Sequence, residues 1–516
     1  MQQSQSKQQV GGILGFIERI GNKIPDITIL FISAFLLVCV VSAVLAQIHF
    51  NYVHPATGRP IEITNMLSGK ALVDLMSKMV TNYANFPPLS MVIVATLGIG
   101  IADGSGYINT GLKKILSITP KVLITPVVIL VGMLSHLGPD SGYVIIIPIA
   151  AYMFYAVGKH PLAGIAASFA GIAGAFAANY TPSAIDPVIQ GFTQSAAQII
   201  DPGYQENELC NYFYAFASTF IVIGACWWVT EKITNPWLWK ACPLDDDLDL
   251  GNENNSSITP SENRAFKIAT AVLLLMLTGL AAALYPADSI LRAPDGVIAS
   301  FKAPIMQSIV SLIFIFAALV GLVYGIACGK FKSPKDVTAA MEEITKTLVQ
   351  LIVFYFFAAQ FLYAFGASNM GALIAVSGAE FLKSLNLPPQ VTVFGIIVFV
   401  ALLNLIITSA SAKWAILAPI FVPMLMAVGI APELTQVAFR VSDSAVNVVT
   451  PMFAFYPLII LYCQKYVKNA GIGTLSSMML PYTIALLVSL TFMLYLFWWL
   501  DIPLGFQADY VYPRRF

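Results

Sequence analysis

Charged residues are scarce in this sequence of 516 residues. Only 10% of the residues are charged, whereas 58% are hydrophobic, and the mean hydropathy is +0.78. A soluble domain carries about a quarter charged residues, so this chain lacks the polar surface that water requires. Several apolar runs exceed the roughly 20 residues needed to cross a bilayer. The composition therefore predicts an all-α polytopic membrane protein.

Motifs of catalysis and of covalent cross-linking are also missing. The six cysteines are scattered without a CxxC pair, and most fall in apolar runs, which argues against a disulfide framework or a metal site. The sequence has no GxSxG, HExxH or P-loop motif. The net charge is zero, and no basic stretch is typical of nucleic-acid binding. We expect no enzyme activity, no cofactor and no nucleic-acid partner; a channel remains the alternative class.

What the sequence does contain is an internal repeat. Two stretches share aromatic, proline and Val-Gly positions at identical spacing. The matched positions are Tyr143, Pro148, Val157-Gly158 and Pro161 in the first stretch, and Trp414, Pro419, Val428-Gly429 and Pro432 in the second. After a slip of two residues, Thr181-Pro182 recurs as Thr450-Pro451. Duplicated membrane units with broken helices are typical of secondary transporters.

The apolar runs predict nine spans and two re-entrant hairpins. Seven ordinary spans are expected at 25–48, 87–107, 207–231, 264–286, 304–327, 347–367 and 475–500. Each repeat supplies a hairpin (120–158 and 390–429) and a helix broken near the midplane (161–200 and 432–466), which completes the count. Turn residues place the hairpin tips at 135–142 and 408–413, and the breaks at 179–183 and 447–451. The first hairpin is expected to open inward and the second outward, so the two units are predicted to be inverted copies.

Arg440 and Asp443 are the charged residues inside the second broken helix. Arg440 lies eight residues into that helix, about 12 Å along its axis. A charge at such depth costs at least about 2.5 kcal/mol, so it normally faces a partner or a cavity. Asp443, three residues on, is the partner expected from the sequence. Two interpretations stay open: a structural ion pair, or a guanidinium that binds a substrate carboxylate and is positioned by Asp443.

Asp186 follows the first break, next to Asn179 and Thr181. Asp186 could cap the helix that resumes there, or it could relay a proton or another cation. Asn179 and Asn447, with the carbonyls freed at the two breaks, are alternative ligands for Na⁺. We predict H⁺ or Na⁺ as the coupling ion, Asp186 as the proton site, and Asn179 and Thr181 as its neighbours.

At these residues the sequence resembles the AbgT family, the aminobenzoyl-glutamate transporters of bacterial inner membranes. The resemblance covers nearly the whole chain and is carried by Ser409-Ala-Ser411-Ala-Lys-Trp414, Pro432-Glu433, Arg440-Val-Ser-Asp443-Ser, Asn447, Thr450-Pro451 and Asp186-Pro187. It implies a homodimer whose protomers have a substrate-carrying core and an outer frame. It also implies transport of p-aminobenzoyl-glutamate and export of sulfonamide antimetabolites on the proton gradient, as an antiporter.

The resemblance implies a substrate site made of several of these residues. The predicted substrate-binding residues are Ser411, Trp414, Pro432, Arg440, Asp443, Asn447 and Pro451. Trp414 could equally be a packing residue or a platform on which an aryl substrate stacks. The alternative function is a dicarboxylate or Na⁺ carrier of the wider superfamily, which shares the inverted hairpin plan.

In family terms the chain is predicted to divide into frame and core segments. They are a cytoplasmic N-terminal segment (1–24), frame spans (25–119), a first core unit (120–200), one span (201–231), a cytoplasmic linker (232–263), frame spans (264–367), a second core unit (390–466), a last span (475–500) and a tail (501–516). The distribution of lysines places the N-terminus in the cytoplasm of a multi-pass inner-membrane protein. Arg514-Arg515 would then lie outside, against the positive-inside rule.

Overall fold

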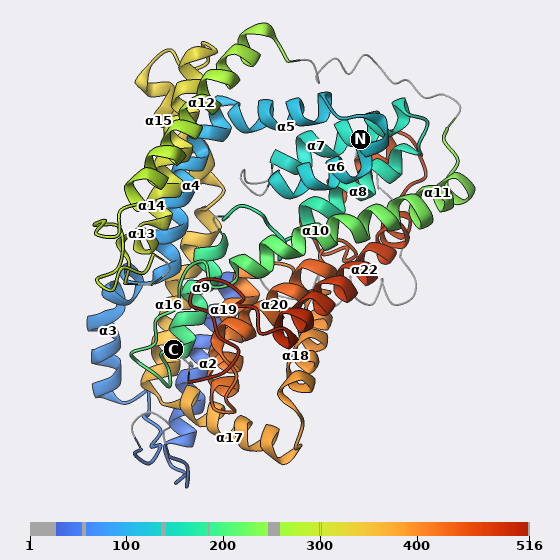
Figure 1. Cartoon of the computed structure of the whole chain (residues 1–516). Helices are drawn as coiled ribbons and strands as arrows, with labels where there is room; N and C mark the ends of the chain where they lie inside the picture. Colours follow the sequence, from blue (N-terminus) through green and yellow to red (C-terminus); the bar gives the residue numbers. More distant parts are fainter. Residues whose placement is uncertain are drawn as a thin grey trace, which may run out of the picture.

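The computed structural model describes residues 27–53, 58–135, 141–183, 185–245, 258–298, 300 and 302–513. The predictions for the N-terminal segment, the first hairpin tip at 136–140, the linker residues 246–257 and Arg514-Arg515 lie outside these residues. Within the described ranges the chain is built of helices, and its β-structure is limited to two isolated bridges. Figure 1 shows α4, α12, α14 and α15 on one side of the molecule, and α6, α7, α8, α10, α11 and α22 on the other.

Seven helices of the described part are long and apolar enough to cross a membrane, and they are the seven ordinary spans predicted above. They are α2 (Ile27–Leu45), α4 (Pro87–Ser105), α10 (Tyr212–Val229), α12 (Pro260–Leu284), α14 (Ile309–Ala327), α16 (Val349–Ala367) and α22 (Ile472–Trp499). Two of the seven run together with a neighbouring helix: α3 (Gly69–Ala84) precedes α4, and the π-helical turn η3 (Thr230–Thr234) joins α10 to α11 (Asn235–Ala241).

The two repeats each contribute a bent helix pair, a hairpin arm and a broken helix. The first repeat comprises α5 (Tyr107–Ser117), η1 (Lys121–Leu123), α6 (Ile124–Leu134), α7 (Ser141–Ala156), α8 (Pro161–Ala173) and α9 (Ile185–Ala197). The second comprises α17 (Met370–Ser384), α18 (Pro389–Asn404), α19 (Ala410–Met426), α20 (Pro432–Val446) and α21 (Tyr456–Gln464). The bends before α6 and before α18 are 119° and 117°. Both predicted helix breaks are present, between α8 and α9 and between α20 and α21.

The helices of one repeat pack on those of the other in a reciprocal way. Helix α9 contacts α19 and α20, and the corresponding helix α21 contacts α7 and α8. Helices α6, α7 and α8 lie at one end of the molecule, and α17 and α18 lie at the other (Figure 1). This exchange of partners is what two copies related by a two-fold axis in the membrane plane produce.

Helices α2, α4, α12, α14 and α16 are here called the frame. Helix α4 packs closely on α14, and α2 packs on α16. A Cβ atom at Gly98 of α4 would overlap the backbone of Phe314 in α14, which explains the glycine at that position. A Cβ atom at Gly171 of α8 would lie 2.5 Å from the carbonyl oxygen of Ile129 in α6. Glycine therefore sets the approach of helices in both the frame and the first repeat.

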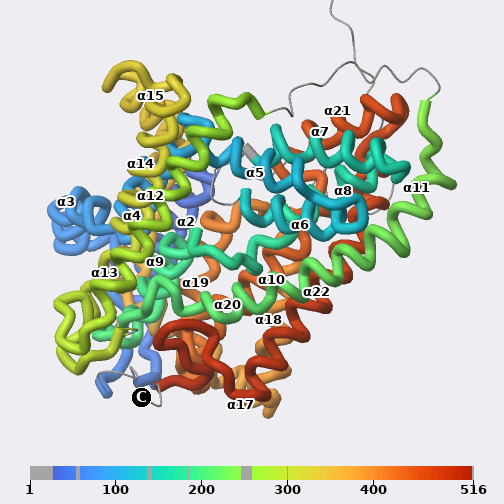
Figure 2. Tube along the Cα trace, turned by 45° about the horizontal axis from the view of Figure 1, so that its top comes forward, coloured from blue at the N-terminus to red at the C-terminus, as the bar shows by residue number. Residues whose placement is uncertain are grey.

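Some stretches between the predicted spans are helical. Helices α5 and α17, and α15 (Pro334–Lys346), lie between predicted spans or hairpins, and α11 occupies part of the predicted linker. These helices are short and each carries a lysine in its last turn, so they give no long apolar run. Figure 2 shows α3 and α15 projecting at the edge of the frame. The second hairpin tip also differs, because Ala410 to Lys413 already belong to α19 and the tip lies at 405–409.

Candidate functional site

Helix α20 is buried along its whole length although it carries Glu433, Arg440 and Asp443. Proline at its first position fixes the φ angle there and lacks the N–H group that a helix start leaves unbonded. Buried charges are stable only when they are paired and hydrogen-bonded. The partners of this helix therefore define the polar centre of the molecule.

Arg440 pairs with Asp186, not with Asp443 as the sequence had predicted. Its Nη2 atom lies 2.7 Å from Asp186 Oδ1, and the two side chains are 4% and 12% exposed. The same Nη2 atom donates a longer hydrogen bond, 3.4 Å, to the carbonyl oxygen of Phe176 in the first break. The ion pair thus joins the second broken helix to the point where the first broken helix resumes.

Asp186 uses its other oxygen to hold the start of α9. Oδ2 accepts hydrogen bonds from the backbone N–H of Ser183 (2.8 Å) and from the Ser183 hydroxyl (3.0 Å). Asp186 lies within the first turn of α9 and bonds a residue that precedes the helix, so it fixes the start of α9 without being the N-cap residue considered above, and this contact coexists with the ion pair. One carboxylate both orders the break and faces the guanidinium.

Asn179 and Thr181 order the break itself. Asn179 Oδ1 lies 3.5 Å from the N–H of Thr181 and 3.4 Å from its hydroxyl, and the Asn179 N–H donates to the carbonyl of Ala215 in α10. The Tyr212 hydroxyl of α10 donates to the carbonyl of Tyr180 (2.9 Å). The irregular backbone is thereby held against α10, as irregular backbone at membrane depth requires.

Asp443 has a different cation, Lys413 of α19. Lys413 Nζ lies 2.7 Å from Asp443 Oδ1, and both side chains are fully buried. Lys413 Nζ also donates to Asn404 Oδ1, while the Asn404 amide donates to the Asp443 carbonyl (2.8 Å) and to Asn447 Oδ1 (3.1 Å). The Asn447 amide lies 3.4 Å from Asp443 Oδ2. This network fastens α18 and α19 to α20.

Trp414 is enclosed between the repeats. Its ring stacks on Phe439 with centroids 4.4 Å apart, and its Nε1–H donates to the Thr193 hydroxyl of α9 (2.9 Å). The Thr193 hydroxyl in turn donates to Gln436 Oε1. The side chain of Trp414 is fully buried. These contacts favour the packing interpretation of Trp414 in this conformation.

The remaining predicted substrate residues lie at different depths. Ser411, 8% exposed, is in the first turn of α19, two residues before Lys413. Pro432 begins α20, about 12 Å along the helix axis from Arg440. Pro451 lies in the second break, next to Thr450, whose hydroxyl donates to the Leu405 carbonyl (2.7 Å). The ion pairs therefore involve only part of the predicted set.

A cavity of about 350 Å³ lies between the first break and the frame. Pro182 and Ser183 form part of its wall, and apolar side chains of α4, α12 and α14 form most of the rest. Ser183 lines the cavity and donates a hydrogen bond to Asp186, which in turn pairs with Arg440. The cavity wall is thus in direct contact with the ion pair. Its volume is in the range of sites that hold small organic molecules, about 300–1,000 Å³.

Comparison with known proteins identifies the family. Residues 12–512 match the family model described as "AbgT putative transporter family". The chain belongs to the AbgT family. It is 32% identical over 511 residues to the p-aminobenzoyl-glutamate transport protein of Escherichia coli (strain K12), covering 99% of this chain and 98% of that protein.

Two solved structures of AbgT-like transporters are similar to this chain. The YdaH transporter of Alcanivorax borkumensis, described as having an unusual topology, is 36% identical, with a TM-score of 0.87 over 93% of this chain and 100% of that one. MtrF of Neisseria gonorrhoeae, described as illuminating a class of antimetabolite efflux pumps, is 39% identical, with a TM-score of 0.90 over 96% and 100% of the two chains. The predicted family and fold class are confirmed, and so is the prediction of a transporter rather than an enzyme.

Several polar residues of this AbgT chain were not predicted as partners from the sequence. Asn404, Thr193 and Gln436 lie on three different helices and meet only in the folded core. Asn404 ends the apolar helix α18, whereas Thr193 and Gln436 have polar neighbours in α9 and α20, and a membrane helix normally turns such residues toward the protein interior. That signal could have marked them as buried, although it could not have assigned their partners.

The Lys413–Asp443 pair gives a first prediction about stability. Removing one partner of a buried ion pair costs about 3–5 kcal/mol, because the other charge is left uncompensated. Lys413→Met should therefore lower the unfolding temperature of the purified protein by several degrees. The double variant Lys413→Met/Asp443→Asn should recover most of the loss. Thermal unfolding in detergent measures both, with the exposed Lys335→Met as the matched control; a double variant as unstable as Lys413→Met would contradict the pairing.

Proposed function

We propose that this AbgT chain moves p-aminobenzoyl-glutamate, and aryl antimetabolites of the sulfonamide type, across the bacterial inner membrane on a proton gradient. The observation that carries the proposal is the Arg440–Asp186 ion pair, which joins the two repeats beside an apolar cavity. The E. coli relative, named for p-aminobenzoyl-glutamate transport, and MtrF, described with antimetabolite efflux pumps, supply the substrate class.

The chemistry of the site suits an aryl compound that carries carboxylates. A guanidinium binds a carboxylate through two parallel N–H donors, so Arg440 is the proposed anchor for the glutamate end. The apolar cavity at Pro182 and Ser183 is the proposed place for the aromatic ring. In this scheme the substrate carboxylate replaces Asp186 at Arg440, and the released Asp186 accepts the coupling proton.

Proton coupling is favoured over Na⁺ by the surroundings of Asn447. The Asn404 and Asp443 oxygens that lie near Asn447 already face the ammonium group of Lys413. Asn179, the other residue considered for Na⁺, has its side-chain oxygen directed at Thr181. The runner-up, a dicarboxylate or Na⁺ carrier, has the same guanidinium but would make no use of the apolar cavity.

Transport in proteoliposomes tests the proposal. Internal unlabelled p-aminobenzoyl-glutamate should accelerate entry of the labelled compound, as expected of a carrier and not of a channel. An imposed pH gradient should drive accumulation, and an imposed Na⁺ gradient at constant pH should not. Succinate at a tenfold excess should leave the exchange unchanged. Equal competition by succinate, or accumulation driven by Na⁺ alone, would favour the runner-up.

The assembly and orientation are part of the same proposal. Family resemblance favours a homodimer with a cytoplasmic N-terminus. Cross-linking in native membranes and labelling of single introduced cysteines from either side would test these two points.

A further inference from the structure

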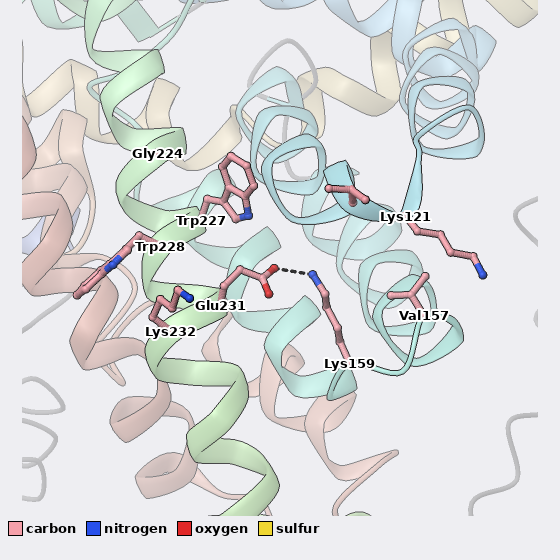
Figure 3. Close-up of a pocket in the computed structure, with 9 residues that line it drawn as sticks. Lys121, Val157, Lys159, Gly224, Trp227, Trp228, Glu231 and Lys232 are labelled. Atoms are coloured by element: carbon pink, nitrogen blue, oxygen red, sulfur yellow. Dashed lines mark hydrogen bonds and ion pairs between the residues drawn. The ribbon is translucent and has the colours of Figure 1, made fainter.

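A second cavity, of about 630 Å³, lies at the far end of α10, among residues to which the proposed transport function assigns no role. Its walls come from the η1 turn, from the connection between α7 and α8, and from the last turns of α10 and η3. Figure 3 shows Trp227 on α10 and Glu231 on the adjoining η3, with Lys159 opposite Glu231 and Lys121 farther across the opening. Three sequence-distant segments thus meet around one open cavity.

The cavity carries an excess of positive charge. Lys121, Lys159 and Lys232 line it, and Glu231 is the carboxylate among its lining residues. Glu231 Oε1 is already bonded to Lys159 Nζ (2.5 Å) and to the Thr125 hydroxyl (2.5 Å), so its charge is compensated. Within the described ranges, Lys121 and Lys232 form no ion pair. The cavity therefore has two lysines available for an anion.

A winding row of side chains on α10 and η3 connects this charge to an apolar stripe. Residues spaced by four are neighbours, and here they are Phe216, Phe220, Gly224 and Trp228 of α10 and Lys232 of η3. Each lies about 40° round the helix from the one before, so the row winds about the helix as it approaches the cavity. The side chains of Phe220 and Trp228 are 64% and 58% exposed. A Cβ atom at Gly224 would meet nothing within 4 Å, so the row has an open gap beside the cavity. Along its length the row is apolar, then open, then aromatic, then basic.

We propose that this cavity binds the headgroup phosphate of an anionic phospholipid, whose acyl chains lie along Phe216 and Phe220. Lysines near a membrane surface attract anionic headgroups, and basic pockets between membrane helices bind them specifically. Tryptophan is the residue that favours the level between headgroup and hydrocarbon. A soluble phosphate would contact the lysines but would gain nothing from Phe216 and Phe220. An anionic phospholipid uses both, because its headgroup binds the lysines and its acyl chains contact the phenylalanines.

Native mass spectrometry of the purified protein in detergent tests the proposal. Dioctanoyl phosphatidylglycerol should bind more tightly than dioctanoyl phosphatidylcholine. Lys121→Gln/Lys232→Gln should weaken phosphatidylglycerol binding at least about tenfold and leave phosphatidylcholine unchanged. Two lysines near the surface together attract an anionic headgroup by more than the roughly 1.4 kcal/mol that a tenfold change in affinity represents. Both lysines are exposed, so the variant should fold normally.

Two further variants separate a site from general surface charge. The matched control Lys267→Gln/Lys335→Gln removes two exposed lysines elsewhere and should bind phosphatidylglycerol as the unmodified chain does. Gly224→Leu keeps every charge but fills the gap in the row, and it should weaken phosphatidylglycerol several-fold. The proposal is overturned if the control pair weakens binding equally, if the two lipids bind alike, or if millimolar inorganic phosphate displaces the lipid.

Discussion

Arg440→Ala is expected to reduce transport of p-aminobenzoyl-glutamate at least about thirtyfold while the protein stays folded. Truncating one member of a buried, hydrogen-bonded charge pair costs about 2–5 kcal/mol, and about 1.4 kcal/mol corresponds to a factor of ten. In the proposed cycle that loss falls on the bound substrate, whose carboxylate occupies the position that Asp186 takes in this structure. Initial rates in proteoliposomes measure the effect.

Arg440→Lys distinguishes an anchoring guanidinium from a structural cation. An ammonium group can neutralise Asp186, but it cannot present two parallel N–H donors to a carboxylate. We therefore expect Arg440→Lys to keep an unfolding temperature close to that of the unmodified chain and still to lose most transport. If Arg440→Lys transports normally, or if Arg440→Ala is unfolded after purification, the ion pair serves the fold and the anchor lies elsewhere.

The sequence predicted the helices of this protein better than their contacts. The seven ordinary spans are long apolar runs, and both breaks coincide with Thr-Pro pairs, so local chemistry was sufficient to locate them. The helices α5, α15 and α17 were missed for the same reason, since short, lysine-bearing helices give no such run. Hydropathy therefore locates helices that are long and apolar enough to cross the bilayer, but it does not locate short helices such as α5, α15 and α17.

The pairing of charges could not be predicted, because it depends on which helices become neighbours. Arg440 and Asp443 are three residues apart, which made them plausible partners. In the fold they face different helices: Arg440 reaches Asp186 at the start of α9, and Asp443 reaches Lys413 in α19. Partners so distant in the sequence leave no local pattern.

The two repeats do not carry charged residues at equivalent positions. The identical spacing of the two copies allows each position of one repeat to be compared with its equivalent in the other. At the shared offset, the positions of Lys413 and Arg440 correspond to Gly142 and Phe169 in the first repeat. The first repeat supplies Asp186 instead, and on that side Tyr143, the counterpart of Trp414, stacks on Phe455 with centroids 4.1 Å apart. The two repeats are thus alike in plan but not in charge, because the positions equivalent to Lys413 and Arg440 are uncharged in the first repeat.

Asp186→Asn is expected to bind substrate but to lose accumulation driven by a pH gradient. In the proposed cycle the substrate carboxylate competes with Asp186 for Arg440, the residue that Asp186 contacts in this structure. A displaced Asp186 would leave an unpaired buried charge, which is costly, and in the proposed cycle proton uptake removes that charge. Binding therefore strengthens as the pH falls, by up to about tenfold per pH unit for one proton. The amide of the variant neither competes nor titrates, so its substrate affinity should be nearly independent of pH.

The sign of this coupling also bears on the direction of transport. A proton and a substrate that favour each other's binding travel together, whereas an exchange of the two requires each to weaken the other's binding. The contact between Arg440 and Asp186 favours joint movement in the conformation seen here.

Two other groups interact with Asp186. The Ser183 hydroxyl donates a hydrogen bond to it, and the Tyr212 hydroxyl of α10 lies close enough to interact with its charge. Tyr212→Phe is therefore the matched control and should keep the pH dependence. Substrate affinity between pH 5.5 and 8, measured with accumulation under an imposed pH gradient, decides the matter. An Asp186→Asn variant that still concentrates substrate under a pH gradient alone would assign the proton to another group.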